Sequence, residues 1–307
     1  MILPRLFLAL ALTCCSAGFA NAQLGNYEND FNAPIFAKRT NVTSLELARK
    51  IFPDAQIDPT ERNTLVATNE IPLRMLDGIT PTGNIKADGM EGKLTVRIED
   101  FIESSDGNEK LLWLFLQAVG EKYKTYSYAG QHILAVYRVR RETSELIDAA
   151  NVKQDDYTHF VEGNSPIANT RKLFIKPRRE AVFIETRATT NGGVTAYSLV
   201  DLDGNGKLNV VLPEFDIWSD QHCNYYIWER AGIRLLKRTV NGYRPIEIFI
   251  ITEKGDGSTS RQVAEWRQRF RYLYEWDASA QSYKIVGGSG KKRRAALDGY
   301  DPCNGSK

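Results

Sequence analysis

The run of nine residues from Asp201 to Asn209 carries the side chains whose types and spacing could do chemistry. Oxygen-bearing side chains stand at its first, third, fifth and ninth positions, and a glycine stands at the sixth. This is the ligand spacing of EF-hand-type calcium loops, in which alternate side chains turn inward and the glycine permits a sharp bend. The expected Ca2+ ligands are the side chains of Asp201, Asp203, Asn205 and Asn209 and the backbone carbonyl of Lys207.

The run lacks the acid that closes such a loop, because its twelfth position is Leu212. Glu214 and Asp216 lie slightly beyond and would have to replace that acid. Two charges in the loop predict weak binding, with a dissociation constant of about 10⁻⁴–10⁻³ M, and a stabilising role for the ion. The alternative is a polar hairpin turn without a metal, since Asp-Gly and Asn-Gly are common turn dipeptides.

The segments on both sides of the run are short and rich in β-branched residues, which predicts strands rather than the helices of an EF-hand. A strand, a calcium loop and a second strand together resemble the FG-GAP and VCBS-type repeats of integrin-like β-propellers. The resemblance covers residues 194–214 in a single copy. It implies calcium ligands at the five positions already named.

The pattern along the rest of the chain is typical of strands. Residues 92–102 alternate apolar and polar side chains, and residues 104–108 predict a turn after them. Further strand segments, among them Gln131–Val139, recur up to residue 286, whereas residues 43–52 predict one short helix. We expect a mostly-β fold with antiparallel sheets in two lobes, forming a partial propeller or a sandwich. Residues 164–177, which contain Pro166 and Pro177, predict a connection. The expected parts are a signal peptide (1–22), a flexible arm (23–42), an N-terminal lobe (43–165), a C-terminal lobe (166–286) and a basic tail (287–307).

The first 22 residues have the features of a secretory signal. Arg5 precedes the apolar stretch Leu6–Cys15, and Ala20-Asn21-Ala22 forms a small-x-small cleavage site. The alternatives are a membrane anchor and a lipoprotein modified at Cys14 or Cys15. We expect the mature chain to begin at Gln23 and to be exported to the periplasm or the extracellular space.

Two cysteines, Cys223 and Cys303, follow the signal, and an oxidising compartment favours a disulfide between them over two unpaired thiols. The chain has 40 basic and 38 acidic residues, and this near-neutral balance argues against nucleic acid as a partner. The basic run Lys291–Arg294 follows a glycine-rich stretch and is expected to be a solvated charge run in a mobile tail.

No segment of the sequence carries a recognised catalytic motif, and the three histidines lack metal-ligand spacing. The aromatic segment Trp218–Trp228 is compatible with a sugar or peptide platform, or with strand residues that fill a core. We therefore predict an exported non-catalytic binding or structural module, with a cell-surface glycan or protein as partner. The alternative is a secreted hydrolase, directed at glycans for example, whose catalytic carboxylates no motif identifies. Glu214, Asp216 and Asp220 are clustered, but acids that follow a calcium loop more often serve the ion or face solvent.

Overall fold

The structure is a computed structural model that describes residues 40–61, 64–69, 73–76, 92–106, 108–121, 130–153, 167–189, 192–222, 225–256 and 263–293. The expected signal peptide, most of the expected arm, and both Cys223 and Cys303 lie outside the described residues. The disulfide and the export signal therefore stay predictions. Neither short helix in the described part of the chain has the length and apolar character needed to cross a bilayer.

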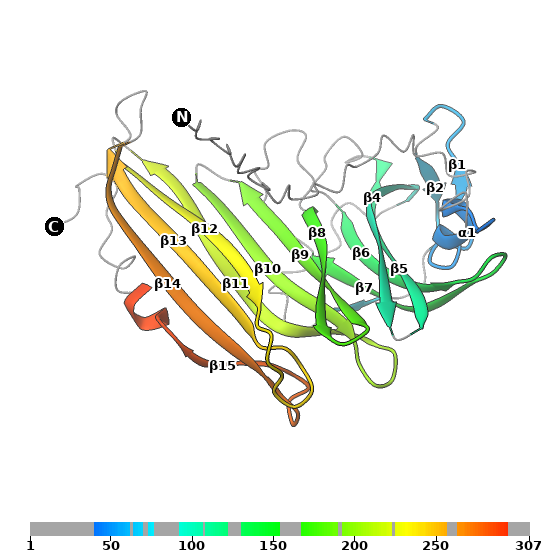
Figure 1. Cartoon of the computed structure of the whole chain (residues 1–307). Helices are drawn as coiled ribbons and strands as arrows, with labels where there is room; N and C mark the ends of the chain where they lie inside the picture. Colours follow the sequence, from blue (N-terminus) through cyan, green and yellow to red (C-terminus); the bar gives the residue numbers. More distant parts are fainter. Residues whose placement is uncertain are drawn as a thin grey trace, which may run out of the picture.

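Antiparallel β-structure makes up nearly all of the described fold, as predicted (Figure 1). The hydrogen-bonded strand order is β15-β14-β13-β12-β11-β10-β9-β4-β5-β6-β7-β3. Its strands are β3 (Arg74–Met75), β4 (Leu94–Asp106), β5 (Glu109–Gly120), β6 (Gln131–Val139), β7 (Ser144–Lys153), β9 (Arg179–Thr189), β10 (Gly192–Leu202), β11 (Leu208–His222), β12 (Tyr225–Leu235), β13 (Ile246–Asp256), β14 (Val263–Asp277) and β15 (Ser282–Gly288). Off this path, β1 (Gln56–Ile57) pairs with β2 (Leu65–Ala67), β2 pairs with β4, and β8 (Ile167–Lys176) pairs with β9.

Three apolar clusters are separated by the strands themselves, because alternate residues of a strand point to opposite faces of a sheet. In β5, Leu114 packs in the first cluster and Phe115 in the second. In β9, Ile184 packs in the second cluster and Phe183 in the third. The layers therefore stack like a sandwich, with β5 and β6 between the first two clusters and β9 and β10 between the second and third.

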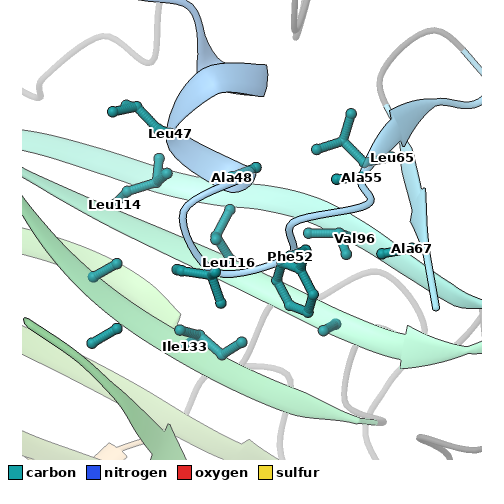
Figure 2. Packing of buried hydrophobic residues seen from close by; sticks show 14 of the residues in the cluster. Leu47, Ala48, Phe52, Ala55, Leu65, Ala67, Val96, Leu114, Leu116 and Ile133 are labelled. Carbon is teal, nitrogen blue, oxygen red and sulfur yellow. The ribbon is translucent and has the colours of Figure 1, made fainter. Parts of the chain in front are cut away.

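The N-terminal helix α1 (Ser44–Ala48) covers the outer face of β5 and β6. A capping box starts it, since the Thr43 hydroxyl accepts from the Glu46 N–H at 3.2 Å and the Glu46 carboxylate accepts from the Thr43 N–H at 2.6 Å. Leu47 and Phe52 are fully buried over the two strands, as Figure 2 shows. The helix predicted at residues 43–52 is confirmed in shorter form, because the chain turns after residue 48.

Two predicted boundaries are wrong. The expected connection at residues 164–177 contains strand β8, and Pro177 lies in the turn that follows the strand. The expected turn at residues 104–108 is mostly strand, because β4 continues to Asp106. Ser104 tolerates burial there because its hydroxyl accepts a hydrogen bond from the Trp113 indole at 2.7 Å.

The second cluster joins the two predicted lobes. It combines Trp113 and Val136 from the first lobe with Val182 and Val200 from the second. Strand β11 pairs with β10 along most of its length but with β12 only at residues 219–222. The β12–β15 strands can therefore fold over β9–β11 and enclose the third cluster.

Candidate functional site

The run Asp201–Asn209 forms the turn of the β10–β11 hairpin. The Asp203 carboxylate accepts from the backbone N–H groups of Asn205 and Lys207, each at 2.8 Å. The Asp203 N–H donates to the Lys207 carbonyl at 2.7 Å, and Gly206 adopts a φ of 77°. The turn thus uses its own oxygens to satisfy its own backbone, as Asp side chains commonly do in loops.

Asp201, the first expected ligand, lies inside the fold with 4% of its surface exposed. Its carboxylate accepts from Arg179 Nε at 2.7 Å and from the Leu202 N–H at 2.8 Å. The Arg179 guanidinium also donates to the Leu202 carbonyl. Burial raises the pKa of Asp201, and the neighbouring guanidinium offsets part of that rise. A protein cation therefore already neutralises this carboxylate.

The other side of the run is held by Asp148 on β7. The Asp148 carboxylate accepts from the Leu208 N–H at 2.9 Å, from Lys207 Nζ at 3.2 Å and from Arg74 at 2.8 Å. Burial acts to raise the pKa of Asp148, but these three hydrogen bonds outweigh it and hold that pKa below its usual range. We call Arg74, Asp148, Lys207 and Leu208 the junction cluster, because it ties the hairpin to β3 and β7.

Three of the side chains expected to bind calcium make hydrogen bonds to protein partners in this arrangement. Asp201 points into the fold toward Arg179, Asp203 binds the backbone of the turn, and the Asn209 amide donates to the Gln281 carbonyl at 3.4 Å. Among the described residues, no three His, Cys, Asp or Glu side chains form a metal-site group. For Asp201 to bind a calcium ion here, its carboxylate would have to exchange Arg179 for the ion. The structure does not test the calcium binding that the sequence predicts.

A second candidate site lies on the face of β12–β14 that points away from the third cluster. It was not identified from the sequence. Directly opposed residues in an antiparallel sheet share a face, so the strand register defines its four rows. These rows are Trp228–Glu253–Arg267, Arg230–Ile251–Arg269, Gly232–Phe249–Arg271 and Arg234–Glu247–Leu273. We call this surface the arginine face.

The two carboxylates of the arginine face lie beneath their cationic partners. Glu253 pairs with Arg267 at 3.2 Å and with Arg230 at 3.7 Å. Glu247 pairs with both arginines beside it in the adjoining strands. The side chains of Glu247 and Glu253 are 5% and 15% exposed, whereas those of their four arginine partners are 59–65% exposed. The surface therefore presents guanidinium groups to solvent.

The fifth arginine of the face, Arg269, stacks on an aromatic ring. Its guanidinium carbon lies 4.3 Å from the centroid of the Phe249 ring. That ring fills the space over Gly232, where an added Cβ would come within 2.1 Å of it. Trp228 stands at the end of the face, 41% exposed, with the Arg230 guanidinium 5.8 Å from its ring. With five arginines and two glutamates, the face carries an excess of positive charge.

The opposite face of the same strands buries a further ion pair. The Glu229 carboxylate accepts from Thr252 Oγ1 at 2.6 Å and from Arg293 Nε at 2.9 Å. Arg293 belongs to the basic run that was expected to be solvated in a mobile tail. That expectation is wrong for Arg293, because a short helical turn at residues 290–293 brings its side chain against a buried acid.

The sequence contained a signal for the arginine face, because Arg267, Arg269 and Arg271 alternate with period two. Of the aromatic segment Trp218–Trp228, Tyr226 is buried and Trp228 is exposed. The side chains of the clustered acids Glu214, Asp216 and Asp220 lie outside what the structure describes. No family model, curated protein or solved structure matches this chain.

Proposed function

We propose that the protein is an exported, non-catalytic binding module that uses the arginine face as its binding platform for a cell-surface glycan. The observation that carries this proposal is the placement of four exposed arginines over two mostly buried glutamates, and of a fifth, Arg269, over the Phe249 ring. A face that serves solubility alone commonly mixes exposed charges of both signs. Here the two glutamates lie beneath the surface, and the exposed groups are positively charged guanidinium donors.

The scaffold supports the same interpretation. Groups on paired strands are held more rigidly than groups on loops, which lowers the entropy lost when a ligand binds. The Glu253 and Glu247 pairs restrain four of the guanidiniums, and Phe249 restrains Arg269. The face therefore offers hydrogen-bond donors in fixed positions before any ligand arrives.

Three of the buried carboxylates are held in the fold in a way that does not suit hydrolysis. A glycosidase needs two carboxyl groups facing the bond to be cleaved, about 5–9.5 Å apart, with one of them able to donate a proton. Asp148 and Glu229 are instead committed to arginine or lysine partners. Asp201 has a raised pKa, but it is buried against Arg179. Each of these three acids thus has a structural role within the fold.

The proposal is tested by measuring retention of the mature protein on immobilised neutral and acidic polysaccharides. The double variant Arg267→Gln/Arg269→Gln removes two charges from the face, and we expect it to lose most of the retention. The matched control Arg140→Gln/Arg141→Gln removes two charges from exposed positions after β6 and should bind like wild type. Equal retention of the two variants, or no retention of wild type on any polysaccharide, would contradict the proposal.

A further inference from the structure

The arginine face has a repeat that limits what its ligand can be, provided that the proposed function holds. We infer that the ligand is an acidic polysaccharide, carboxylated or sulfated, that lies along β14. In this arrangement Arg267, Arg269 and Arg271 each take one acidic group of the polymer, and Trp228 contacts a sugar ring. Three observations support this inference: the spacing of the arginines, the contacts of Arg269 and the position of Trp228.

The spacing of the arginines suits an extended polymer. Side chains two residues apart on a strand lie about 6.6–6.8 Å apart on the same face. The three β14 arginines therefore form a straight line of evenly spaced cations along the strand. Arg230 and Arg234 on β12 form a second line, which lies two strand spacings, or about 10 Å, from the first. A linear polymer with regularly repeating acidic groups matches the line of three arginines on β14.

Arg269 is the arginine best prepared to bind an anion. Glu253 and Glu247 already engage the arginines on either side of it in β14. Arg269 lies opposite Ile251, and its guanidinium carbon lies over the Phe249 ring, so a cation–π contact rather than a carboxylate supports it. An arginine fork can form two parallel hydrogen bonds with a carboxylate or a sulfate group.

Trp228 favours a polysaccharide over a nucleic acid. An exposed indole at the end of the face can stack on the apolar side of a sugar ring. Single-stranded nucleic acid is bound by proteins that offer successive aromatic rings and a strongly basic groove. The described part of the face has one exposed indole, and Phe249 is covered by Arg269. The near-neutral charge of the whole chain also argues against a nucleic acid as the ligand.

The test is a titration of the full mature chain with four polymers: polygalacturonate, dextran sulfate, neutral dextran and oligothymidylate. We expect tighter binding of at least one acidic polysaccharide than of dextran or oligothymidylate, with binding that weakens as salt increases. Arg269→Gln should reduce that affinity about tenfold or more, and Arg269→Lys should restore only part of it, because lysine keeps the charge but not the fork. Arg140→Gln is the control, and unchanged melting of each variant shows that the fold is intact.

The outcomes separate this inference from the proposed function. Equal binding of dextran and the acidic polysaccharides, lost in Trp228→Ala but not in Arg269→Gln, would overturn the inference and leave a glycan-binding face. Preference for oligothymidylate would overturn the inference in favour of nucleic acid. Failure of all three polysaccharides to bind would remove the proposed function as well.

Discussion

Arg179 and Asp201 form an ion pair that water hardly reaches, with side chains 17% and 6% exposed. Removing one partner of a buried pair leaves an uncompensated charge, which typically costs about 3–5 kcal/mol, whereas replacing both partners by apolar groups is often close to neutral. We therefore expect Arg179→Met to lower the free energy of unfolding by about 3 kcal/mol. The double variant Arg179→Met/Asp201→Leu should recover most of that loss.

Urea denaturation of the two variants and of wild type measures this difference. Arg138→Met is the control, because Arg138 pairs with two half-exposed acids, Glu109 and Glu145. Its cost should stay below about 1 kcal/mol. A double variant at the Arg179 site that is no more stable than Arg179→Met alone would contradict this account of the pair.

The junction cluster makes stability depend on pH through Asp148. Because hydrogen bonds hold the folded-state pKa of Asp148 below 3.8, its carboxylate stabilises the fold above that pH. That contribution is lost as the pH falls through the lowered pKa. We expect Asp148→Asn to be less stable than wild type by about 1–3 kcal/mol at pH 6, with the gap narrowing below pH 3.8.

Denaturant titrations at a series of pH values between 6 and about 2 follow that gap. Glu145→Gln on the same strand is the control, because Glu145 is exposed and its pair with Arg138 lies at the surface. A gap of constant size across the whole pH range would show that the Asp148 charge does not contribute to the stability.

The β10–β11 hairpin is the element on which the sequence and the structure differ most. Its sequence predicts calcium, but its carboxylates already bind Arg179 and the backbone of the turn. We therefore expect wild type to melt at the same temperature in millimolar calcium and in chelator. Asp203→Ala should melt lower than wild type by a similar amount in both, because it removes the hydrogen bonds that close the turn.

Thermal melting of both proteins in calcium and in chelator shows whether their stability depends on calcium. A calcium-dependent rise in wild type that disappears in Asp203→Ala would mean that Asp201 exchanges Arg179 for the ion. The calcium loop predicted from the sequence would then be correct, and the arrangement described for the hairpin would be that of the metal-free state.

The strands could be predicted where local patterns define them. The predicted strand Gln131–Val139 coincides with β6, and the helix start at Thr43 follows from its capping residues. Strand β8 was missed because prolines on both sides of it are also typical of connections. The row of arginines on β14 follows from alternation alone. That Glu253 on β13 pairs with both Arg267 on β14 and Arg230 on β12 depends on the strand register, which the sequence does not reveal.

At the scale of the whole molecule, the layers decide which surfaces are free. Strands β5 and β9 are apolar on both faces, so their sequences could not show which layer would cover each face. Likewise, Arg179 lies 22 residues before Asp201 in the sequence, and the pairing of β9 with β10 brings the two side chains together. The stack buries one face of β12–β14 against the third cluster and leaves the arginine face outward.

The central claim, that the arginine face is where a polymer binds, can be tested by chemical footprinting of arginines. The mature protein is treated with phenylglyoxal with and without a bound acidic polysaccharide, and modification at each arginine is measured by mass spectrometry. We predict protection at the arginine face, most strongly at Arg269, and unchanged modification at Arg140 and Arg141. Bound polymer that protects Arg140 and Arg141 but leaves Arg269 fully reactive would contradict the account.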